Sequence, residues 1–138
     1  MHEFLGTDSR KMQRVSSAMA DYVKKVPNVL VAWDAILLEK LKSPQTKVGR
    51  TQVRNILRFY QFSDIPKKIE GELYQMCFDY ITNPASAIAL RAFSMTICTR
   101  IAQRYPELKA ELYDAISMTL PNGSAGIRNR GEKMLKML

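Results

Sequence analysis

Four cationic side chains follow one another along a single predicted helix, at steps of three, four and four residues. They are Lys47, Arg50, Arg54 and Arg58. At 100° per residue they fall within a stripe of roughly 80° on the helix surface, away from the apolar positions of the same segment. Aligned cations of this kind can bind a run of phosphates or carboxylates, with an affinity that falls as salt rises. The stripe predicts a binding surface for an anionic partner; a solvated helix face is the alternative.

Arginine also recurs at a fixed spacing of 37 residues, in the pairs Val53-Arg54, Leu90-Arg91 and Ile127-Arg128. If the chain is a stack of helical hairpins, the three guanidinium groups form a row across neighbouring helices. Such a row would suit phosphates or an acidic peptide. The alternative is that each arginine bonds a neighbouring turn and stabilises the stack.

The last predicted helix is strongly basic and carries Arg128, Arg130, Lys133 and Lys136 with a single acid, Glu132. Cations near the carboxyl end of a helix are expected from the helix dipole alone. An end helix of a stack is nevertheless free to meet a partner. Arg128, Arg130 and Lys133 therefore join the candidate binding set.

All of these residues lie in segments whose apolar positions recur with helical periodicity. The alternation of apolar and polar residues and the hairpin turns that are typical of strands are nearly absent. Prolines and capping residues delimit seven predicted helices. The first begins at Asp8 or Ser9, after a loosely held start over residues 1–7. The expected helices cover residues 9–25, 28–42, 46–61, 64–82, 85–104, 107–120 and 124–138. Short connections make successive helices antiparallel hairpins, so the predicted fold class is all-α.

Self-similarity at 37 residues is typical of a helical-repeat stack. Residues 83–92 (Asn-Pro-Ala-Ser-Ala-Ile-Ala-Leu-Arg-Ala) and 121–128 (Pro-Asn-Gly-Ser-Ala-Gly-Ile-Arg) resemble HEAT or armadillo-type helical repeats. The resemblance covers about residues 28–138 and implies an α-α superhelix of about three hairpins, with a capping helix at the amino terminus. The hairpins would cover 28–62, 64–105 and 106–138, within a single domain of residues 1–138.

The sequence departs from the HEAT pattern in one respect. Such repeats generally carry an acidic residue about six positions before the arginine, where it helps to bridge neighbouring units. Here Val48, Ala85 and Asn122 stand at those positions. The acidic residue that would help to bridge neighbouring units is therefore missing in all three repeats.

The amino-acid composition of the chain limits the classes of function that it can have. The 138 residues carry 21 Lys and Arg against 13 Asp and Glu, a net charge of +8, which favours polyanionic partners. No stretch reaches the roughly 20 apolar residues that cross a bilayer, and no signal peptide is recognisable. We therefore expect a cytoplasmic protein without membrane contact. Cys77 and Cys98 lie in apolar helical patterns and are expected to be buried thiols.

Residues for catalysis are scarce. His2 is the single histidine, so neither a metal site nor a His-dependent triad can be assembled, and we expect no cofactor and no metal. Trp33-Asp34 is similar to the aromatic and carboxylate pair of HEAT-like DNA alkylpurine glycosylases, but Trp33 occupies an ordinary core position in the predicted helix. An enzyme is not expected.

The sequence thus predicts a non-enzymatic binding module with two open alternatives. In the first, a protein-interaction scaffold binds an acidic or amphipathic segment of a partner protein with the help of Arg54, Arg91 and Arg128. In the second, the Lys47–Arg58 stripe and the carboxyl-terminal cations bind nucleic acid without reading bases. A glycosylase is a distant third. The oligomeric state stays open.

Overall fold

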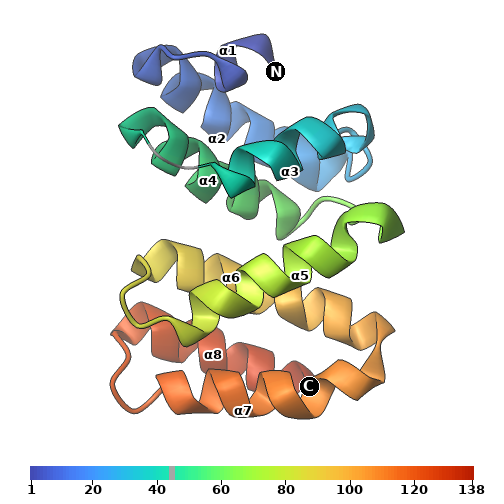
Figure 1. The fold of residues 1–138 in the computed structure, drawn as a ribbon, viewed down its shortest axis with the longest axis vertical. Helices are drawn as coiled ribbons and strands as arrows, with labels where there is room; N and C mark the ends of the chain where they lie inside the picture. Colours follow the sequence, from blue (N-terminus) through green and yellow to red (C-terminus); the bar gives the residue numbers. More distant parts are fainter. Residues whose placement is uncertain (44–45) are drawn as a thin grey trace. The chain divides into compact units, whose positions relative to one another are not determined.

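The chain folds into helices joined by short turns in a computed structural model that describes residues 1–43 and 46–138 (Figure 1). The described residues contain no strand. They form two compact units, residues 1–69 and residues 70–138. None of the described helices combines the length and the apolar character required to cross a lipid bilayer.

Unit 1 is built on a long helix, α2 (Ser9–Lys25), which packs against the short α1 (His2–Leu5) and against α4 (Lys47–Tyr60). The Asp8 carboxylate caps α2 by accepting from the backbone N–H groups of Arg10 and Lys11, at 3.0 and 3.2 Å. A 3-10 turn (Val31–Trp33) leads into α3 (Asp34–Lys42), which packs on α4. The fully buried side chains of this core include Phe4, Met12, Leu37, Ile56, Leu57, Phe59 and Tyr60.

The amino terminus is held in place, so the expectation that residues 1–7 are loose is wrong. Phe4 in α1 is fully buried, and its ring lies 5.2 Å from that of Phe59. The Gln52 side-chain amide, on α4, donates to the backbone carbonyls of Phe4 and Gly6 at 2.9 and 3.2 Å. A buried aromatic ring and two long-range hydrogen bonds thus order a segment too short to show helical periodicity.

Unit 2 contains most of α5 (Lys67–Thr82), then α6 (Ile88–Arg104), a 3-10 turn (Pro106–Leu108), α7 (Lys109–Thr119) and α8 (Ala125–Met137). Helix α6 packs against both α7 and α8, and α7 packs against α8. Ser124 caps α8, since its Oγ accepts from the N–H of Ile127 at 3.3 Å. Gly131 packs closely on the Leu120 side chain, because a Cβ atom there would lie 2.4 Å from Leu120 Cδ2.

The all-α hairpin architecture predicted from the sequence is confirmed, and several predicted boundaries shift. The second predicted helix begins at Asp34 rather than Asn28, because a 3-10 turn precedes it. The fifth begins at Ile88 rather than Ala85, since the Asn83 side chain holds a turn by accepting from the N–H of Ala85 at 3.0 Å. The division between the two units falls within α5, whereas the predicted repeats divide at 62–64 and 105–106. The single domain over 1–138 remains a prediction.

Candidate cationic binding surface

The predicted cationic stripe lies on α4 of unit 1. Thr46 caps this helix by accepting from the N–H of Gly49 at 2.9 Å. The opposite face of α4 is buried in unit 1 and includes Val53, Ile56, Leu57 and Tyr60. Because that face is fixed in the core, the cations at the intervening positions point outward.

We call Lys47, Arg50, Arg54 and Arg58 the α4 ridge. The first three are exposed and Arg58 is half-buried. None of the four side chains makes a hydrogen bond or an ion pair with another residue in 1–43 or 46–138. Their charges are therefore not neutralised by those residues, and each cation has another one turn away. Like charges at these spacings destabilise a helix by roughly 0.2–0.5 kcal/mol per pair.

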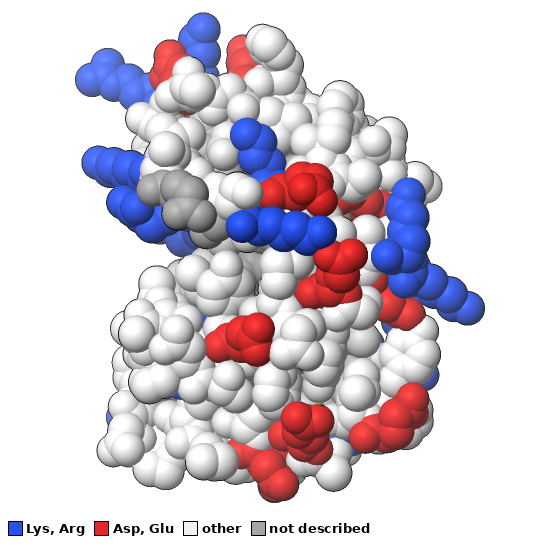
Figure 2. Space-filling model, viewed as in Figure 1, with Lys and Arg blue, Asp and Glu red and all other residues white. Residues whose placement is uncertain are grey.

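The charge of the whole chain is concentrated in the unit that carries the α4 ridge. Residues 1–69 contain thirteen Lys and Arg against six Asp and Glu, a net charge of +7, whereas residues 70–138 contain eight against seven, a net charge of +1. On the face drawn in Figure 2, blue side chains gather mainly over unit 1, while red ones are scattered over both units. Long-range attraction of anions therefore comes from residues 1–69.

Arg91 of α6 has a structural contact. Its Nε and Nη2 atoms donate to the backbone carbonyl of Ile81, in the last turn of α5, at 3.3 and 3.0 Å. Carbonyls at the end of a helix have no partner within the helix. The half-buried Arg91 thus joins the two helices of this hairpin, as the stack-stabilising alternative from the sequence describes.

Arg130 of α8 also bonds within unit 2. Its Nη1 donates to the Ala92 carbonyl at 3.3 Å and to Thr96 Oγ1 at 2.9 Å, both on α6. Burial lowers the pKa of this half-buried guanidinium. Arg130 therefore connects α8 to α6, and these bonds occupy part of its hydrogen-bonding capacity.

Arg128 and Lys133 of α8 are exposed and make no hydrogen bond or ion pair through their side chains with the described residues. Arg91 and Arg128, although 37 residues apart in the same unit, thus have different surroundings. Arg54 belongs to the other unit. A common row of the three arginines stays a prediction.

The surroundings of Trp33 and Asp34 in the structure differ from those predicted. Trp33 is 37 % exposed, so its placement in the core is wrong, because it ends a 3-10 turn rather than lying within a helix. Asp34 is buried, and its Oδ1 accepts a hydrogen bond from the Tyr60 hydroxyl of α4. Burial raises the pKa of the Asp34 carboxyl, against the lowering effect of the Tyr60 bond. The carboxylate joins α3 to α4.

The two cysteines are buried free thiols, as predicted. Cys98 of α6 contacts the Tyr74 carbonyl of α5 at 3.6 Å, and burial raises the pKa of its thiol. Among the described residues, no three His, Cys, Asp or Glu side chains are grouped as metal ligands would be. Five of the predicted cations, Lys47, Arg50, Arg54, Arg128 and Lys133, are exposed and make no side-chain hydrogen bond or ion pair with the described residues, and three of these five lie on the α4 ridge.

Comparison with protein families assigns the fold. A model described as HEAT repeat domain matches residues 12–138. The chain belongs to this family. HEAT repeats are helical-repeat scaffolds that commonly mediate protein interactions, and this HEAT repeat protein has the hairpins that the sequence predicts. Comparisons with curated proteins and with solved structures find no match.

One feature of this HEAT repeat protein is not apparent from the total charge of its sequence. This feature is the division of charge between its two units, which meet in the sequence at residue 69. A running count of charge along the chain carries the signal, because the cations outnumber the acids about two to one before that boundary. The total of +8 alone conceals it.

Proposed function

We propose that this HEAT repeat protein is a non-enzymatic interaction module whose α4 ridge binds an acidic segment of a partner protein. The observation that carries the proposal is the exposure of Lys47, Arg50 and Arg54 without a partner among the described residues. An acidic segment would neutralise the repulsion along the ridge. Part of the binding free energy would then come from relief of that repulsion.

The dimensions of the α4 ridge agree with such a ligand. From residue 47 to residue 58 a helix rises about 16 Å, with one cation at each turn. A partner segment with carboxylates at steps of three or four residues presents its charges at the same interval. The exposed Arg50 and Arg54 can each bind a carboxylate through two parallel hydrogen bonds.

The test measures binding of a fluorescein-labelled peptide of about 16 residues, with glutamates at three- and four-residue steps, by fluorescence anisotropy. We expect Arg54→Glu to weaken binding about fivefold or more, and Lys136→Glu to change it less than about twofold. Lys136 is an exposed cation on α8, so the control applies the same charge reversal outside unit 1. Equal effects of the two variants, or no binding by the wild type, would overturn the proposal.

A duplex DNA of about 20 base pairs is measured in parallel at two salt concentrations. Four phosphate contacts would make the affinity for DNA fall steeply with salt. If DNA binds more tightly than the peptide and Arg54→Glu abolishes that binding, the ridge is a nucleic-acid surface and the protein-partner proposal is wrong.

A further inference from the structure

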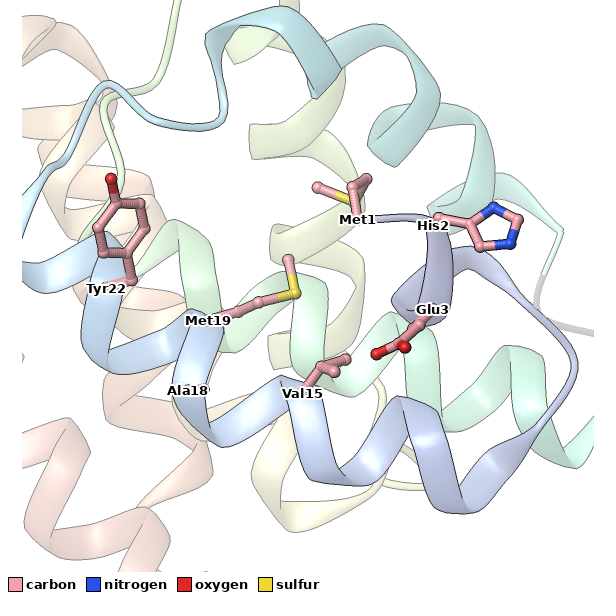
Figure 3. Close-up of a pocket in the computed structure, with 7 residues that line it drawn as sticks. All are labelled: Met1, His2, Glu3, Val15, Ala18, Met19 and Tyr22. Carbon is pink, nitrogen blue, oxygen red and sulfur yellow. The ribbon is translucent and has the colours of Figure 1, made fainter.

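Unit 1 has a second surface that the α4 ridge does not use, a groove between α1 and α2 (Figure 3). Its volume is about 580 Å³, and it is mostly apolar and open to solvent. We call it the α1–α2 groove. Met1, His2 and Glu3 line it on one side, and Val15, Ala18, Met19 and Tyr22 line it on the other. Tyr22 is 54 % exposed, a high value for a large ring.

Helix α2 has two apolar faces. The face that includes Met12, Ala20 and Val23 is buried in unit 1. The four α2 residues of the groove stand at positions i, i+3, i+4 and i+7, the spacing by which one helix packs against another. Among residues 1–43 and 46–138, no helix lies over this second face, although α1 borders it. The pattern is therefore that of a helix-packing seam that faces solvent.

Charge indicates which helix would fit. Lys11 stands four residues before Val15, and Lys25 stands three residues after Tyr22, so a cation lies in register beyond each end of the seam. Arg14 and Asp21 flank its solvent side, and Glu3 and His2 lie on the α1 side. The exposed charges of α2 comprise five cations, Arg10, Lys11, Arg14, Lys24 and Lys25, and one acid, Asp21. A partner with acidic residues beside its apolar stripe complements this helix.

We propose that the α1–α2 groove binds an amphipathic helix with acidic flanks from a partner protein. From Lys11 to Lys25 the seam extends about 21 Å, the length of a helix of roughly four turns. The partner's apolar side chains would pack on Val15, Met19 and Tyr22, and its acids would meet Lys11 and Lys25. In this mode of recognition, a helix lies in a groove and contacts it through side chains spaced three and four residues apart.

A second copy of this chain is a poorer occupant. A two-fold dimer through the groove would bring the same surface of both copies together. Lys11, Arg14 and Lys25 of one copy would then approach the same cations of the other. Like charges placed against each other across an interface disfavour it.

The test uses a labelled helical peptide of about 18 residues, with leucines at positions i, i+3, i+4 and i+7 and glutamates between them. Two further peptides replace either all glutamates with lysine or all leucines with serine. Ala18→Glu places a charge inside the groove, and Ser17→Glu places the same charge on an exposed, more distant position of α2. Both positions are exposed, so both variants are expected to fold, which circular dichroism checks.

We expect Ala18→Glu to weaken binding of the leucine–glutamate peptide about tenfold. Ser17→Glu should weaken this binding less than about twofold. The lysine peptide and the serine peptide should each bind the wild type about tenfold more weakly. Arg54→Glu separates this groove from the α4 ridge. If Arg54→Glu weakens binding of the leucine–glutamate peptide and Ala18→Glu does not, the peptide binds the α4 ridge and the groove proposal fails.

Three other results would overturn the proposal. The first is no binding of the leucine–glutamate peptide to the wild type. The second is an equal effect of Ala18→Glu and Ser17→Glu. The third is a dimer in sedimentation analysis that Ala18→Glu dissociates, since a second copy would then be the occupant.

Discussion

Arg91 donates two hydrogen bonds to one carbonyl oxygen, that of Ile81, and so closes the end of α5 against the start of α6. Its partner in the 37-residue spacing, Arg128, is exposed and makes no such bond to the described residues. The two arginines share a sequence position within the repeat but differ in role.

The first prediction compares these two residues. Arg91→Met should lower the free energy of unfolding by about 1–2 kcal/mol, because the carbonyl of the buried Ile81 loses a charged donor. Arg128→Met should stay within about 0.5 kcal/mol of the wild type, as is usual at exposed sites. Urea unfolding followed by circular dichroism measures both, and equal losses would contradict the assigned roles.

The second prediction concerns the α4 ridge. Arg54 has Arg50 four residues before it and Arg58 four residues after it. Arg54→Glu converts two repulsive pairs into two attractive ones, so it should stabilise the protein by about 1–2 kcal/mol. Thermal unfolding at low salt should show this gain, and high salt should reduce it. If Arg54→Glu binds the acidic peptide more weakly but unfolds at a higher temperature, the arginine at this position contributes to binding and not to stability.

The third prediction concerns pH. Burial raises the pKa of Asp34 in the folded state above the value of about 3.9 expected for an unfolded chain. Its contribution to stability is therefore fully present below the unfolded pKa and is lost as pH rises through the folded pKa. Relative to Asp34→Asn, the wild type should lose stability as pH rises above about 4. Urea unfolding of both proteins over a pH series tests this, and a difference that does not vary with pH would contradict it.

The fourth prediction concerns Gly131 in α8. Its Cβ in an alanine variant would lie 2.4 Å from Leu120 Cδ2 and 3.3 Å from Ile116 Cγ2. Gly131→Ala should therefore lower the free energy of unfolding by about 1 kcal/mol, after the gain in helix propensity is included. Gly71→Ala is the control, because nothing lies within 4 Å of that Cβ position. It should raise stability by about 0.5–1 kcal/mol, and a stabilising Gly131→Ala would show that the Leu120 side chain turns away from the added methyl group.

Much of the helical framework could be predicted from local signals. Asp8, Thr46 and Ser124 are capping residues, and the helices after them begin where the sequence predicts, within one residue. The length of α2 follows from its cap and from Val26-Pro27, because a residue before proline avoids the helical conformation. These features depend on a few neighbouring residues, so the sequence reveals them.

Contacts between distant segments could not be predicted in the same way. The order of residues 1–6 depends on Gln52 and Phe59, which lie about fifty residues away. The position of Trp33 depends on a 3-10 turn that the helical pattern of residues 28–42 conceals. The stripe on α4 could be predicted because it lies within one helix, whereas the contacts of Arg91 and Arg130 involve a second helix.

The uneven charge of the two units has a kinetic consequence. At physiological ionic strength, attraction between exposed charges extends about 8 Å, so an approaching polyanion is steered toward nearby cations during the encounter itself. With a net charge of +7 on residues 1–69 and +1 on residues 70–138, productive collisions should begin at the amino-terminal unit. The association rate of an acidic partner should therefore depend mainly on the first 69 residues, wherever on the molecule its final contacts form.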